Sequence, residues 1–216
     1  MITIKSKTLK LDYFSSMKAF FNLMKPRVMS LVIFTCAVGL LIAPVKVNFL
    51  DTIFCLLAVA LGSGAAGALN MWYESDLDSL MTRTCLRPIP TGKLTRNQAL
   101  AFGILSSLIS IIVLYIFSNL ISSILLATTI LFYVFVYTIW LKRKTPQNIV
   151  IGGASGALPP VIGWAIATNG IALEPIVLFL IIFIWTPSHF WALSLYKSED
   201  YRKARIPMLP ITSGVR

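Results

Sequence analysis

Residues 97–141 read NQALAFGILSSLISIIVLYIFSNLISSILLATTILFYVFVYTIWL, a run of 45 residues without a charged side chain. A helix crosses the hydrocarbon core of a membrane in about 20 residues. A single helix of this length would reach roughly twice that thickness. We therefore expect the run to fold back near Ser118 and Asn119, so that two antiparallel helices cross the membrane.

The rest of the chain has the same character. Hydrophobic residues make up 57% of the 216 residues and charged residues 12%, whereas soluble domains contain about 25% charged residues. The sequence therefore predicts an all-α fold, a polytopic transmembrane helical bundle that forms a single membrane domain over residues 1–216. The uncharged runs divide into about six expected spans, at residues 28–45, 53–72, 98–117, 121–141, 149–168 and 175–195.

The basic residues indicate how the bundle is oriented. Of the 19 Lys and Arg residues, 18 fall on one side of the predicted bundle and only Lys46 falls on the other. Basic loops stay in the cytoplasm, so we expect that side, with the N-terminus, to be cytoplasmic. The net charge of +11 then reports topology, and we expect no nucleic-acid partner because no separate basic domain is present.

Residues 1–27 precede the first expected span. An apolar stripe within residues 13–24 predicts an amphipathic helix that lies on the inner membrane surface. A mitochondrial transit peptide is the alternative, but arginine is scarce there and the span follows at once. We therefore expect the inner (cytoplasmic) membrane of a bacterium rather than the mitochondrial inner membrane.

Acidic residues gather where the second uncharged run ends, in NMWYESDLDSLMTRTCLRPIPTG (residues 70–92). On a continuing helix, Asn70, Glu74 and Asp78 would share one face, and Asp76 would point to the opposite side. Carboxylates at this spacing repel one another unless a cation lies between them. Oxygen ligands suit Mg²⁺, so Glu74 and Asp78 are the predicted metal ligands.

Arg83 and Arg87 follow the carboxylates, four residues apart. Guanidinium groups offer forked donors to phosphate oxygens. Carboxylates, metal and arginines together predict a pocket for a diphosphate at the cytoplasmic mouth of the bundle. The alternative is that these are solvated loop charges in local ion pairs.

This stretch resembles the first signature of the UbiA-type intramembrane prenyltransferase superfamily, and in particular its branch of farnesyltransferases that act on haem B. The resemblance extends over about residues 22–211, and its other motifs are MKPRVMSLVIFT (24–35), LKRKTPQNIVIGGASGALPPVIGW (141–164) and WTPSHFWALSLYKSEDYRKARIPMLP (185–210). It implies Mg²⁺-assisted transfer of a farnesyl group from farnesyl diphosphate to a vinyl group of haem B, giving haem O. It also implies a functional partner, the haem A synthase that acts next.

The resemblance assigns roles to further residues. It places Asn70, Glu74, Asp78, Arg83 and Arg87 in the first metal–diphosphate site, although the family usually has Asp at the position of Glu74. It further implies a metal-binding and substrate-binding role for Asp200, in an incomplete second acidic motif that begins at Tyr196. The candidate phosphate contacts, for which a plain topology role is the alternative, are Lys142, Arg143 and Lys197.

His189 is the only histidine, near the inner end of the sixth expected span. Ionisable groups inside membranes are costly and indicate function, and haem iron commonly takes an imidazole ligand. Because the family shares the HFW element, we expect His189 to contact haem, with structural hydrogen bonding as the alternative.

The resemblance fades after residue 211, earlier than in full-length members of the superfamily. We therefore expect a prenyltransferase fold that lacks its last helices. Three alternatives stay open for the function: a truncated, non-catalytic remnant, a prenyltransferase that acts on a quinone precursor, and a transporter or channel.

Overall fold

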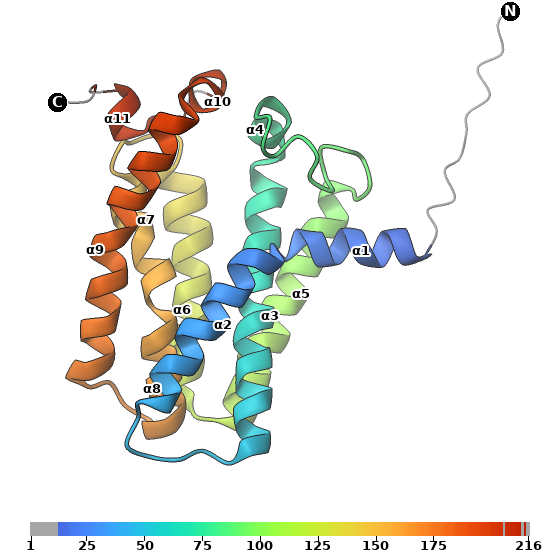
Figure 1. Ribbon diagram of the computed structural model, residues 1–216. Coiled ribbons are helices and arrows are strands. Elements are labelled where there is room, and N and C mark those ends of the chain that lie inside the picture. The colour runs from blue at the N-terminus through green and yellow to red at the C-terminus, as the bar shows by residue number, and fades with distance from the viewer. Residues whose placement is uncertain (1–12, 205, 213, 215–216) are drawn as a thin grey trace, which may run out of the picture.

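The computed structural model describes residues 13–204, 206–212 and 214, and in these residues the regular structure is entirely helical (Figure 1). The predicted all-α class is confirmed. The elements, in chain order, are α1 (Tyr13–Leu23), α2 (Pro26–Leu41), α3 (Phe49–Tyr73), α4 (Ser75–Leu80), α5 (Arg96–Phe117), α6 (Leu120–Leu131), the π-helix η1 (Phe132–Leu141), α7 (Asn148–Ala157), α8 (Pro159–Thr168), α9 (Leu173–Tyr196), α10 (Ser198–Lys203) and α11 (Leu209–Thr212).

Five helical segments of the described chain are long and apolar enough to cross a membrane, and they cover Phe49–Tyr73, Arg96–Phe117, Leu120–Leu141, Asn148–Thr168 and Leu173–Tyr196. A sixth crossing requires α1 and α2 together, which are bent by 50° at their junction. The 16 residues of α2 rise only about 24 Å, less than the hydrocarbon core of about 30 Å. With five such segments, the chain is a multi-pass membrane protein whether or not α1 and α2 form a sixth crossing.

The first expected span, residues 28–45, is wrong at its end, because α2 stops at Leu41. Pro44 explains the early stop, since a proline disfavours the helical conformation of the residue before it. The fifth expected span, 149–168, agrees with the apolar segment Asn148–Thr168, which contains one internal break. It divides into α7 and α8 at Leu158, immediately before Pro159.

The predicted reversal at Ser118 and Asn119 is confirmed, since α5 ends at Phe117 and α6 begins at Leu120. The Asn119 side chain caps α6, because its Oδ1 accepts a hydrogen bond from the Ser122 amide at 2.9 Å. Its Nδ2 donates to the Ala165 carbonyl at 2.8 Å. One residue therefore turns the chain and ties this turn to α8.

Small residues let the helices of the bundle approach closely. A Cβ atom on Gly163 would lie 1.9 Å from the Cys36 carbonyl oxygen, and one on Gly39 would lie 2.0 Å from the Pro160 carbonyl oxygen. Only glycine fits at these two contacts between α2 and α8. The helix α9, by contrast, lies at one edge of the bundle (Figure 1) and leaves most of its apolar residues exposed.

Short helices cover one end of the bundle. There α4, α10 and α11 lie together (Figure 1). Leu77 and Met81, from α4 and the residue after it, form one buried cluster with Tyr201, Ala204 and Met208 from the α10–α11 region. The C-terminal helices thus hold α4 in place directly above the end of α3.

Candidate functional site

The site is built on the junction of α3 and α4. The expectation of one continuous helix through this stretch is wrong: α3 ends at Tyr73, and Glu74 leaves the helical conformation with φ −95° and ψ 14°. The Glu74 amide nevertheless donates to the Asn70 carbonyl at 2.9 Å, and the Asp78 amide donates to the Glu74 carbonyl at 2.8 Å. The four-residue spacing therefore survives the break.

The predicted common face is present. Asn70, Glu74 and Asp78 are buried, with exposed fractions of 1%, 2% and 3%. The Asp76 side chain on the opposite side is 59% exposed. The break at Glu74 thus changes the backbone without moving the three site residues apart.

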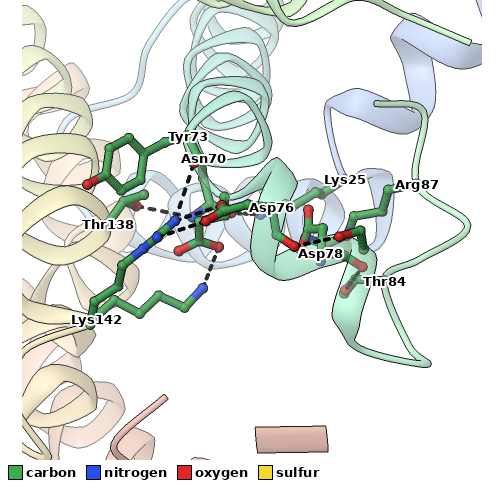
Figure 2. A network of polar contacts seen from close by, with 12 residues as sticks. Lys25, Asn70, Tyr73, Asp76, Asp78, Thr84, Arg87, Thr138 and Lys142 are labelled. Atoms are coloured by element: carbon green, nitrogen blue, oxygen red, sulfur yellow. Dashed lines mark hydrogen bonds and ion pairs between the residues drawn. The ribbon is translucent and has the colours of Figure 1, made fainter. Parts of the chain in front are cut away.

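Each of the three buried side chains meets a basic side chain from another segment (Figure 2). Lys142 Nζ lies 2.5 Å from Glu74 Oε2. A single guanidinium nitrogen, Arg87 Nη1, lies 2.7 and 2.8 Å from the two carboxylate oxygens of Asp78. Charge-assisted bonds of this kind offset the cost of burying a carboxylate.

Lys25 supplies the third basic group and donates to Asn70 Oδ1. It lies in the link between α1 and α2, in the left-handed region at φ 54° and ψ 63°, and Pro26 begins the next helix. The sequence pattern did not single out Lys25, because a lysine before a span normally marks topology.

The π-helix η1 brings Thr138 and Lys142 to the site. Thr138 is fully buried. Its hydroxyl donates to the Tyr133 carbonyl at 2.9 Å and accepts from Asn70 Nδ2 at 3.1 Å. π-Helical turns are rare and occur frequently at functional sites. Periodicity did not predict this one, since an uncharged apolar run looks the same in either kind of helix.

The remaining predicted residues lie elsewhere. None of the hydrogen bonds or ion pairs of the described residues joins Arg83, His189, Lys197 or Asp200 to the buried face of α3 and α4. Arg83 is exposed. His189 is also exposed and stacks on Trp185, with ring centroids 4.3 Å apart.

Arg143 and Lys197 are both exposed, just after η1 and at the end of α9. Arg143 donates to the two carboxylate oxygens of Asp76 at 2.8 and 2.9 Å. Although partial burial acts in the opposite direction, these hydrogen bonds hold the pKa of Asp76 below its usual range. The Lys197 ammonium lies 4.9 Å from the centroid of the Tyr196 ring.

Asp200 is buried and binds neutral donors. Its two carboxylate oxygens each lie 2.6 Å from Thr82 Oγ1, and the Thr82 amide lies 3.4 Å from Oδ1. The Thr82 hydroxyl holds the pKa of Asp200 below its usual range. Asp200 thus fastens α10 to the loop that follows α4.

Two carboxylates and one amide oxygen lie on the buried face of α3 and α4, and a metal ion would need ligands of this kind. Within residues 13–204, 206–212 and 214, no three His, Cys, Asp or Glu side chains lie close enough to hold a metal, so Asp200 does not join Glu74 and Asp78. Glu74 Oε1, however, is buried without a hydrogen-bond partner. Since Mg²⁺ commonly takes only one or two carboxylates, with water and phosphate as further ligands, the residues fit Mg²⁺.

A cavity of about 110 Å³ begins at Lys25 and extends into the bundle. Its wall is almost entirely apolar or small and comes from α2, α3, α6, η1, α7 and α8. The lining includes Val28, Val32, Val59, Gly67, Leu126, Tyr133, Gly156 and Ile162. A polar cluster thus meets an apolar cavity at a single lysine.

Sequence comparison finds close relatives. A model of the UbiA prenyltransferase family matches residues 32–216. The chain is 74% identical over 195 residues to the protoheme IX farnesyltransferase of Pelagibacter ubique, covering 90% of this chain and 64% of that protein. It is 55% identical over 212 residues to the protoheme IX farnesyltransferase of Ehrlichia ruminantium strain Welgevonden, covering 98% and 72%. The chain therefore spans less than two thirds of the Pelagibacter protein.

Solved structures share the fold. A UbiA homologue from Archaeoglobus fulgidus bound to DMAPP and Mg²⁺ matches with a TM-score of 0.73 at 17% identity, covering 90% of this chain and 69% of that one. A digeranylgeranylglyceryl phosphate synthase matches with a TM-score of 0.75 at 18% identity, covering 91% and 68%. At these identities the likeness concerns the arrangement of the helices alone.

Proposed function

The chain belongs to the UbiA prenyltransferase family, and from this premise we propose that it transfers a farnesyl group from farnesyl diphosphate to a vinyl group of haem B, giving haem O. The observation that carries the proposal is the group of buried site oxygens facing three basic side chains at the mouth of an apolar cavity. The relatives named protoheme IX farnesyltransferase, at up to 74% identity, support haem B as the acceptor.

In this proposal Glu74 and Asp78 hold Mg²⁺, with Asn70 beside them. The metal would supply Lewis-acid stabilisation of the negative charge that develops on the departing diphosphate. The solved relative bound to DMAPP and Mg²⁺ supports a metal in this role. Glu74 Oε1, which is buried without a hydrogen-bond partner, would be one ligand atom of the metal.

The three basic residues would bind the diphosphate itself. Lys25, Lys142 and Arg87 now face the site oxygens. A metal-bound diphosphate would bring its own anionic oxygens, and the same ammonium and guanidinium groups would then donate to them. The additional proposed phosphate contacts are Arg83, Arg143 and Lys197, which lie exposed at the same rim.

The apolar cavity would hold the first part of the farnesyl tail and exclude water from the allylic cation. Its volume of about 110 Å³ is below the 300–1,000 Å³ typical of small-molecule pockets. The rest of the tail would therefore run between helices toward the lipid. His189, exposed on a membrane-spanning helix beside Trp185, is the proposed haem contact.

The proposed location is the bacterial inner membrane, with the N-terminus in the cytoplasm. The excess of Lys and Arg on one side supports this orientation, and the bacterial relatives support this membrane. Farnesyl diphosphate would then enter from the cytoplasmic side. The haem A synthase that uses haem O is a proposed functional partner.

A conversion assay tests the proposal. Membranes that contain the 216-residue chain would be supplied with haem B, farnesyl diphosphate and Mg²⁺, and haem O would be measured by mass. We expect Asp78→Asn to reduce product formation by about 100-fold or more. Asp76→Asn, on the same short helix but exposed, is the matched control and should retain activity.

Three outcomes would contradict the proposal. An inserted and folded chain that forms no haem O would overturn the reaction. A chain that instead prenylates a quinone precursor supplied in parallel would overturn the acceptor. Equal losses in Asp78→Asn and Asp76→Asn would overturn the role of the buried face.

A further inference from the structure

The side-chain amide of Asn70 is held in one orientation from a neighbouring helix. An asparagine amide has an oxygen on one side and an NH₂ group on the other, and only the oxygen can face a cation. Asn70 is 1% exposed, so water does not select its orientation. The side chains around it must do so.

Thr138 makes this selection. A threonine hydroxyl has a single proton to donate and can accept through its lone pairs. The Thr138 proton is directed to the Tyr133 carbonyl at 2.9 Å. Thr138 can therefore only accept from Asn70, at 3.1 Å. The NH₂ group of Asn70 must therefore face Thr138. Its Oδ1 must then face Lys25 and the mouth of the cavity.

The π-helix makes the arrangement available. In an α-helix, a threonine hydroxyl usually donates to a carbonyl three or four residues earlier. Here the acceptor is the Tyr133 carbonyl, five residues before Thr138, as the wider turn of η1 allows. In the next turn, the Lys142 amide likewise donates to a carbonyl five residues earlier, that of Tyr137, at 3.0 Å. The Tyr133 carbonyl thus takes up the only hydroxyl proton of Thr138, so in the hydrogen bond between Thr138 and Asn70 the amide must be the donor.

We propose that Thr138 is a positioning residue for the metal–diphosphate site, which directs the Asn70 oxygen toward the bound metal. The inference rests on the proposed function, since it takes Mg²⁺ with diphosphate as the occupant. Lys25 supports the same orientation of the amide. A diphosphate would draw the Lys25 ammonium toward its own oxygens, and Thr138 would then be the group that keeps the amide from turning.

Binding of Mn²⁺ in place of Mg²⁺, measured by EPR on the purified chain with inorganic pyrophosphate, tests the inference. We expect Thr138→Val to weaken Mn²⁺ binding about tenfold, within the range for residues that orient metal ligands. Thr138→Ser keeps the hydroxyl and should restore binding. Thr35→Val is the matched control, because among the residues that the structure describes the Thr35 hydroxyl donates only to backbone carbonyls of its own helix.

The same Thr138→Val substitution in an Asn70→Asp variant tests whether Thr138 acts by orienting the amide. A carboxylate presents an oxygen to the metal in either orientation, so it needs no such positioning. In that background, Thr138→Val should change Mn²⁺ affinity less than twofold. An equal loss in both backgrounds, unchanged affinity in Thr138→Val alone, or no Mn²⁺ binding by the wild-type chain would overturn the inference. Melting temperatures of all variants separate these results from misfolding.

The readout also separates the two proposals. A chain that shows the expected pattern of Mn²⁺ affinities but forms no haem O overturns the proposed reaction and retains the role of Thr138. If the chain forms haem O and Thr138→Val leaves the Mn²⁺ affinity unchanged, the role of Thr138 is overturned and the reaction is retained.

Discussion

Two acidic segments lie at the same end of the bundle, and they differ in what faces their carboxylates. At the end of α3 and in α4, Glu74 and Asp78 each meet a basic side chain, Lys142 or Arg87. In α10, Asp200 meets the hydroxyl and the amide of Thr82. The first segment is thus balanced by charge and the second by neutral hydrogen bonds.

This difference indicates that the carboxylates of the two segments have different roles. A carboxylate held by a lysine can exchange that lysine for a metal ion, because the metal also supplies positive charge and the lysine can turn to a phosphate. A carboxylate held by a threonine on a neighbouring loop has no such alternative cation within its hydrogen-bonded group. It orders the loop instead, and this loop carries Arg87 to Asp78.

The largest effect is expected where the charge balance of the first segment is broken. Lys142→Met leaves the buried carboxylate of Glu74 without its counter-charge. Removing one partner of a buried pair typically costs about 3–5 kcal/mol. Because the Lys142 side chain is still 19% exposed, we expect the free energy of unfolding to fall by roughly 2 kcal/mol, the discount reflecting solvent screening. Chemical unfolding of the purified chain in micelles measures this loss.

The control for Lys142→Met is the same substitution in a Glu74→Gln background, where no buried charge remains. There the loss should be less than about 1 kcal/mol, the net worth of an ordinary hydrogen bond. Mg²⁺ alone should also stabilise Lys142→Met more than the wild-type chain, since the metal replaces the missing charge beside Glu74. Equal losses in both backgrounds would show that Lys142 contributes packing rather than charge.

A smaller effect is expected in the second segment, from Asp200→Asn and from Thr82→Val. Either change would release the loop that carries Arg87 from α10, so we expect each to reduce haem O formation by about tenfold. If Asp200 orders the loop, both variants should leave the Mg²⁺ concentration for half-maximal activity within about twofold. Both should also speed tryptic cleavage after the exposed Arg83.

The predicted role of Asp200 as a metal ligand gives a different result. In that case Asp200→Asn would raise the required Mg²⁺ concentration about tenfold or more, whereas Thr82→Val would not. Thr82→Ser, which keeps the hydroxyl, should behave as the wild type in either case. A divergence between Asp200→Asn and Thr82→Val would therefore remove the distinction between the two acidic segments.

The two segments also show what the sequence can and cannot predict. Uncharged runs and their lengths predicted the helical bundle and the reversal at Asn119, because hydrophobicity and length are local properties. Spacing placed Asn70, Glu74 and Asp78 on one face, since a four-residue hydrogen-bond pattern continues across the break at Glu74. The break itself was not predicted, because no proline or glycine marks it.

The partners of these residues were harder to predict. Lys142 was a candidate only as a phosphate contact, and Lys25 and Thr138 were not candidates at all. Each comes from a segment distant in sequence, and its role depends on how helices pack. The π-helical turn that aims Thr138 has no sequence signal of its own in an apolar run.

The smallest effect is expected at the ion pair on the opposite side of α4. Asp76 and Arg143 have side chains 59% and 35% exposed, and exposed pairs contribute about 0–1 kcal/mol. Asp76→Asn and Arg143→Gln should each change the melting temperature slightly and the rate of haem O formation at saturating farnesyl diphosphate less than about twofold. The two variants together separate a surface ion pair from a substrate contact. If Arg143 binds phosphate, Arg143→Gln raises the KM for farnesyl diphosphate. Asp76→Asn would instead release Arg143 from its partner and leave that KM unchanged or lower it.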